Sequence, residues 1–217
     1  MNKKIVAMMT AMVVLFGMVV GGTIAWLTDS EAPVVNTFVA GNIDIELDEA
    51  PLKADGKTID TTVERVKVNT SYKLLPGNTL QKDPEVRVLD ESEACWLFIK
   101  IEESTDFLTY MTYSVVDDWT PLNDEDGDGI ADDGVYYQEV DSLVSRDDNT
   151  DVDDANAEEF QILTDNKVVV KNDLTKQQLD AITVNPTLTI TAYAVQKDNV
   201  ATAADAWEIL FPTPVTP

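Results

Sequence analysis

The sequence predicts a mainly β protein: a jelly-roll-like antiparallel β-sandwich with one or two short helices and an N-terminal signal helix. Apolar residues alternate with polar ones in many segments, which is the period of a strand with one buried face. These segments are short and are separated by turn residues, as in sandwiches and jelly rolls. The first 25 residues differ from the rest, since they join a basic start to a long apolar stretch.

The predicted strands cover most of the chain after the N-terminal segment. Residues 94–101 form a nearly continuous apolar run that indicates a central strand, and residues 187–195 alternate cleanly as the last strand. Alternation also spans 38–47 around Gly41, where a bulge or bend is expected. The other predicted strands are 63–68, 86–89, 108–116, 135–137 and 168–170.

Two short helices are predicted near the C-terminus. The first covers 175–182, with Thr175 or Asp173 as its capping residue. The second covers 203–210, with Thr202 as its cap and an aspartate at the third helical position.

Two segments are predicted to lie outside the regular elements. Residues 147–159 are very acidic and are expected to form a loop. Residues 212–217 form a Pro-rich tail that suits neither a helix nor an inner strand.

The composition favours one acidic domain and excludes several functions. Hydrophobic residues make up 44% of the 217 residues, which is enough for a real core. Forty acidic and 15 basic residues give a net charge of −25, so we expect no nucleic-acid partner. The chain has no histidine, which removes the Ser-His-Asp triad and His-ligated zinc, and we expect no enzyme. The single cysteine, Cys95, cannot form an internal disulfide and is expected to be buried.

The N-terminal segment has the layout of a secretory signal. Lys3 and Lys4 precede an apolar run over 5–20, and small residues follow. We expect cleavage between Ala25 and Trp26; the alternative is a retained anchor, since the run approaches the length that spans a bilayer. The predicted organisation is a signal peptide (1–25), an N-terminal segment (26–41), a sandwich domain (42–211) and the tail (212–217).

The clearest chemical motif is the acidic segment 124–133. Three aspartates at alternate positions can direct their carboxylates to one point, and Gly129 allows a sharp turn. The spacing matches the first positions of an EF-hand loop, but Val135 stands where that loop has its closing glutamate. The motif is closer to the short calcium loops of dockerins and thrombospondin type 3 repeats. The predicted ligands of a structural Ca²⁺ are Asp124, Asp126, Asp128, the Ile130 carbonyl, Asp132 and Asp133.

The alternative for this segment is an acidic hairpin tip without an ion. Residues 119–122 before it and 135–137 after it have the pattern of two paired strands.

Several segments resemble the TasA/camelysin family, biofilm-matrix proteins of Gram-positive bacteria that are exported through the signal peptidase SipW. The N-terminal signature is Gly-Gly-Thr-Ile-Ala-Trp-Leu-Thr-Asp at 21–29, followed by Asn-Thr-Phe-Val-Ala-Gly-Asn-Ile-Asp-Ile at 36–45. A lysine, a Pro-Gly turn and a Lys-Asp pair follow within 73–84. The segments 194–196 and 202–207 are similar to the C-terminal end of family members, while 104–185 matches no family motif.

The resemblance implies a secreted jelly-roll subunit of matrix or surface fibres. In such fibres the freed N-terminal segment of one subunit adds as a strand to the next. The partners would be the chain itself or related matrix subunits, with a SipW-type peptidase during export and membrane contact only through an uncleaved signal. The donor would be 26–41, with the apolar anchors Trp26, Leu27, Val34, Val35 and Phe38.

Two other functions remain open. A calcium-stabilised binding module or adhesin at the cell surface is the main alternative, because the acidic loop suits it without polymerisation. A camelysin-like metallopeptidase is the remote one, since the chain has no histidine and no H-E-x-x-H helix.

Overall fold

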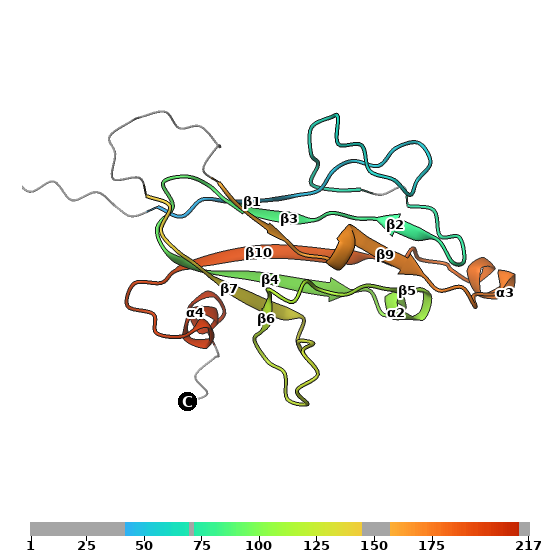
Figure 1. Cartoon of the computed structure of the whole chain (residues 1–217). Coiled ribbons are helices and arrows are strands. Elements are labelled where there is room, and N and C mark those ends of the chain that lie inside the picture. The colour runs from blue at the N-terminus through green and yellow to red at the C-terminus, as the bar shows by residue number, and fades with distance from the viewer. Residues whose placement is uncertain (1–41, 70–71, 145–156, 213–217) are drawn as a thin grey trace, which may run out of the picture. The chain divides into compact units, whose positions relative to one another are not determined.

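The computed structural model describes residues 42–69, 72–144 and 157–212, and these are mainly β, with antiparallel sheets and three short helices (Figure 1). They lie in the unit Gly41–Pro217. The predicted signal peptide, its cleavage site at Ala25 and Trp26, the donor segment and the last five residues of the tail fall outside the described residues.

The largest sheet in the described part of the chain has four antiparallel strands. Its nine-residue strands β4 and β10 pair along their whole length, from Cys95 opposite Gln196 to Glu103 opposite Leu188. The order across the sheet is β10 (Leu188–Gln196), β4 (Cys95–Glu103), β7 (Val135–Val140) and β6 (Thr120–Pro121).

Two three-stranded antiparallel sheets supply the facing layer. One has the order β1 (Ile45–Asp48), β3 (Glu85–Val88) and β8 (Glu158–Gln161). The other has the order β2 (Thr79–Gln81), β9 (Lys167–Val170) and β5 (Met111–Thr112).

Strand β4 is buried on both faces, which explains its continuous apolar sequence. The side chains of Cys95, Leu97 and Ile99 enter the main core between the sheets, and burial raises the pKa of the Cys95 thiol to about 11. The alternate side chains Trp96 and Phe98 enter a second cluster on the opposite face. The predicted central strand and buried cysteine are therefore confirmed.

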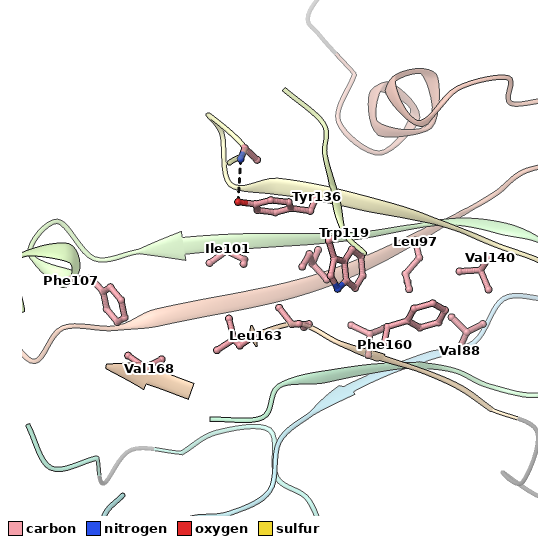
Figure 2. Close-up of a cluster of buried hydrophobic side chains, with 14 of the residues drawn as sticks. Val88, Leu97, Ile101, Phe107, Trp119, Tyr136, Val140, Phe160, Leu163 and Val168 are labelled. Atoms are coloured by element: carbon pink, nitrogen blue, oxygen red, sulfur yellow. Dashed lines mark hydrogen bonds between the residues drawn. The ribbon is translucent and has the colours of Figure 1, made fainter. Parts of the chain in front are cut away.

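The main core joins side chains from both layers. Leu97 and Val140 of the large sheet lie opposite Val88 and Phe160 of the facing layer (Figure 2). Trp119 is also buried there, and its indole N–H donates to the Gln161 carbonyl at 2.8 Å. Each fully buried large apolar side chain stabilises the fold by about 1.5–3 kcal/mol relative to an exposed one.

Both predicted helices are present. In α3 (Lys176–Asp180), Thr175 and Gln178 form a capping box. In α4 (Ala203–Leu210), the Thr202 side chain accepts from the Asp205 N–H, as predicted. Helix α4 covers the second face of the large sheet, where the rings of Trp207 and Phe98 lie 5.2 Å apart.

Three predicted elements are wrong. Residues 63–68 form no strand and make only a single bridge, between Val66 and Glu49. Their valines do not pack as one face of a sheet, since Val68 is 69% exposed. The predicted strand 108–116 instead begins inside the helix α2 (Phe107–Tyr110), and only Met111–Thr112 pair in a strand. The acidic loop 147–159 ends earlier than predicted, because Glu158 and Glu159 belong to β8.

The long segment between β1 and β2 (residues 49–78) forms an excursion from the sheets, and Arg65 attaches it to the sheet of β1, β3 and β8. Its Nε donates to Asp48 Oδ1 at 2.5 Å, and its Nη1 donates to Asp83 Oδ2 at 3.1 Å. Its Nη2 also donates to the carbonyls of both aspartates. Asp48 is shared with Arg87, and the buried Asp83 carboxylate also accepts from the Ala50 N–H. These charge-assisted bonds link the excursion to the ends of two strands.

We predict that Arg65→Ala lowers the free energy of unfolding by about 2–4 kcal/mol, because Asp48 and Asp83 each lose a charge partner in a partly buried place. Urea unfolding followed by tryptophan fluorescence measures this change. The control is Lys176→Ala, which removes an exposed helix ion pair with Asp180 and should cost less than about 0.5 kcal/mol. Equal losses in both variants would contradict the bracing role of Arg65.

Candidate functional site

The acidic motif occupies the loop between the paired strands β6 and β7. The strand pairing continues into the loop, since the Leu122 N–H donates to the Val135 carbonyl and the Asp132 N–H to the Asn123 carbonyl, at 2.8 and 2.9 Å. The predicted hairpin is therefore present, and it holds the acidic residues at its tip.

Three of the predicted ligands lie together. Carboxylate oxygens of Asp124, Asp126 and Asp128 are within 4.8 Å of one another. Asp124 is half-buried, while Asp126 and Asp128 are exposed. The alternate spacing in the sequence thus places these three carboxylates on one side of the tip, as predicted.

Backbone N–H groups hold Asp124 in place. Its Oδ1 accepts from Gly127 and Asp128 at 2.8 and 3.1 Å, and its Oδ2 accepts from Gly129 at 3.0 Å. Gly127 and Gly129 have φ angles of +75° and +82°, which side-chain-bearing residues rarely adopt. The two glycines therefore let the chain curl around one carboxylate.

The predicted ligands Asp132 and Asp133 do not join this cluster. Asp132 Oδ2 accepts from the Glu125 N–H at 2.8 Å. Both oxygens of Asp133 accept hydrogen bonds, from Asn123 Nδ2 at 2.5 Å and from the Val135 N–H at 3.0 Å. These two aspartates stabilise the loop through hydrogen bonds to its backbone and to Asn123. Their spacing in the sequence is the same for this role and for metal binding, so the sequence alone does not separate the two.

Ile130 is 61% exposed, and its N–H donates to Asp128 Oδ1 at 2.8 Å. The loop thus presents one large apolar side chain next to its carboxylates.

Tyr136 supports the base of the loop from β7. Its hydroxyl accepts from the Ala131 N–H at 3.1 Å (Figure 2), and the Ala131 side chain is buried. Burial raises the pKa of the Tyr136 hydroxyl, and the Asp128 and Asp124 charges add to this rise. The hydroxyl therefore remains a neutral acceptor at physiological pH.

The three clustered carboxylates fit a hard cation. They offer oxygen ligands only, as Ca²⁺ prefers, and accepting N–H bonds leaves lone pairs on the same oxygens. Ca²⁺ takes six to eight oxygens, so backbone carbonyls and water would have to supply the rest.

A second feature is an open edge of the large sheet. Within the described residues, β10 pairs with β4 alone, so one side of its backbone has no strand partner. Its sequence, Leu-Thr-Ile-Thr-Ala-Tyr-Ala-Val-Gln, contains no charged residue, proline or glycine. A long edge without such residues is open to pairing with another strand.

The other edges of the described sheets are protected or short. Strands β1 and β8 carry acidic side chains, β6 ends in a proline, and β2 and β5 have three and two residues. Sequence reasoning predicted the strand at 187–195 but missed its edge position. The signal that could have found it is the absence of charge in a chain of which 25% is charged.

The fold and these two sites define a mainly β protein with an acidic candidate cation loop and, within the described residues, one long uncharged strand at a sheet edge. No family model, curated protein or solved structure matches the chain. Among residues 42–69, 72–144 and 157–212, no helix has the length and apolar character needed to cross a membrane.

We predict that Gly134→Ala destabilises the protein by about 2–4 kcal/mol, because the new Cβ would overlap the Ile101 carbonyl oxygen at a φ of +71°. The control is Gly127→Ala, at a similar φ of +75° with open space around it, for which we expect about 1 kcal/mol. Thermal unfolding of both variants measures the difference. Equal losses would show that the close approach to β4 contributes nothing.

Proposed function

We propose that the chain is a secreted structural subunit of extracellular matrix or surface fibres of a Gram-positive-type bacterium, and that its subunits join by strand addition. The observation that carries this proposal is the nine-residue, uncharged edge of β10. The resemblance to the TasA/camelysin family supports it, and the jelly-roll arrangement that the resemblance implies is part of the proposal.

The donor in this proposal is the N-terminal segment 26–41. Its second part, 32–41, contains no charged residue, so it suits an uncharged edge. An added strand satisfies the open N–H and C=O groups, and each hydrogen bond contributes about 0.5–1.5 kcal/mol net. Removal of the signal 1–25 by a SipW-type peptidase would free the donor end outside the membrane.

The side chains of β10 suit such an addition. Leu188, Ile190, Ala192 and Ala194 pack against the main core, while Tyr193 and Val195 pack against the cluster under α4. A strand laid along β10 would therefore extend two apolar surfaces at once, which adds burial to the hydrogen bonds.

We predict that Thr189→Lys prevents fibre formation while the subunit stays folded. Thr189 is exposed on β10 and lies opposite Glu102 of β4, so the lysine gains a favourable cross-strand neighbour. The same lysine places a charge on the edge that an added strand would have to cover. Electron microscopy of the exported protein measures fibres, and circular dichroism checks the fold.

The control is Thr112→Lys, the same change at an exposed position of the two-residue edge strand β5. It should leave fibres unchanged. Fibres of normal length from Thr189→Lys, or a wild-type protein that remains monomeric under all conditions, would contradict strand addition at β10.

The second candidate function is a calcium-stabilised binding module or adhesin at the cell surface. The observation that favours it is the convergence of Asp124, Asp126 and Asp128. It predicts saturable binding to a glycan or a host protein without polymerisation, whereas the fibre subunit forms long assemblies on its own.

We predict that the protein binds Ca²⁺ and that Asp126→Asn weakens binding about tenfold or more, because one ligand charge is lost. Isothermal titration calorimetry measures both affinities. Asp118→Asn, an exposed change outside the loop, is the control and should leave the affinity unchanged. Absence of heat with millimolar calcium would exclude the site.

A further inference from the structure

The basic residues of this acidic protein are concentrated in one segment. Residues 51–82 contain six of the 15 basic residues and only three acidic ones, whereas the whole chain carries −25. Arg65 and Lys82 of this segment pair with the buried acids Asp83 and Glu49. The remaining four are exposed: Lys53, Lys57, Lys67 and Lys73.

Two of these lysines, Lys53 and Lys73, border a hollow whose lining is part polar and part apolar. It has a volume of about 420 Å³, and Lys53, Lys73, Leu52 and Val68 are among the residues that line it. Val68 is 69% exposed although it is a large apolar side chain. This surface, which we call the basic hollow, combines positive charge with uncovered apolar area.

The acidic loop 124–133 has the complementary character. Asp126 and Asp128 present exposed carboxylates, and Ile130 presents an apolar side chain that is 61% exposed. The loop extends from the large sheet, whereas the basic hollow belongs to the excursion that follows β1 of the facing layer. The two project from opposite sides of the sheets in Figure 1, so they cannot meet within one molecule.

We propose that the basic hollow binds the acidic loop 124–133 of a second copy of this chain. Carboxylates of the loop would lie against Lys53 and Lys73, and Ile130 would enter the hollow beside Val68. Because two different surfaces meet, the contact is heterologous and repeats from one copy to the next. It uses no part of β10, so it does not depend on strand addition.

The apolar part of both surfaces favours a protein partner over a simple polyanion. A polyanion would pair with the lysines but would leave Val68 exposed, whereas the loop supplies both carboxylates and Ile130. The repulsion between two copies of net charge −25 is screened beyond about 8 Å at physiological ionic strength, while touching groups still attract. Ca²⁺ on the carboxylates would compete with the lysines and weaken the contact.

A charge exchange between the two surfaces tests this contact. One variant combines Lys53→Glu with Lys73→Glu, and the other combines Asp126→Lys with Asp128→Lys. Sedimentation velocity on the exported protein measures self-association without calcium. Each variant alone should associate about tenfold more weakly than wild type, and an equimolar mixture should recover association. Recovery in the mixture cannot come from misfolded variants.

Two further measurements separate this contact from strand addition. The association should weaken in high salt and should persist in Thr189→Lys, which acts only on the β10 edge. Lys176→Glu on α3 is the matched control and should associate as wild type does.

Three results would overturn the proposal. The first is a wild type that does not self-associate, and the second is a mixture that fails to recover. The third is unchanged self-association of the Lys53→Glu and Lys73→Glu variant together with loss of its binding to polyphosphate, which would assign the hollow to an anionic polymer.

Discussion

The double burial of β4 is the constraint on which the rest of the structure depends. One face of β4 requires the facing layer of short sheets, because Leu97 and Ile99 are fully buried against it. The other face requires α4, which covers Phe98 through Trp207 and Ala206. Its two edges are taken by β7 and β10. The acidic loop leads into β7 and the edge strand is β10, so both candidate sites are attached to strands that pair with β4.

The distribution of charge is the second organising feature. With 40 acidic and 15 basic residues, the chain has too few basic side chains to neutralise its acidic ones. Several of these basic side chains form ion pairs that stabilise the fold. Arg65, Arg87 and Lys82 pair with acids near the excursion between β1 and β2. The carboxylates at the tip of the 124–133 loop are held by backbone N–H groups. This loop therefore keeps its negative charge concentrated and unbalanced.

The sequence predicted features that arise from local chemistry. The β4 run, the alternating strand at β10, the Thr202 cap and the convergence of three aspartates all depend on residues close together in the chain. Features that depend on distant partners were missed. The valines at 63–68 have the strand period, but Arg65 is held by Asp48 and Asp83, and only a single bridge between Val66 and Glu49 forms there. The edge position of β10 depends on which strands do not pair with it, and the only local trace of it is the absence of charge in this strand.

The uncharged edge strand β10 and the net charge of the chain act in opposite directions on association between copies. A long uncharged edge would normally promote aggregation, and most proteins prevent this with a charge or a proline on the edge strand itself. Strand β10 has neither, and the −25 charge of the whole chain would instead oppose the approach of other copies. Such protection depends on conditions, because salt shortens its range and a cation on the acidic loop lowers its strength. In the fibre proposed above, subunits of this kind would stay apart when dilute and unscreened, and strand addition at β10 would be favoured where ions are plentiful.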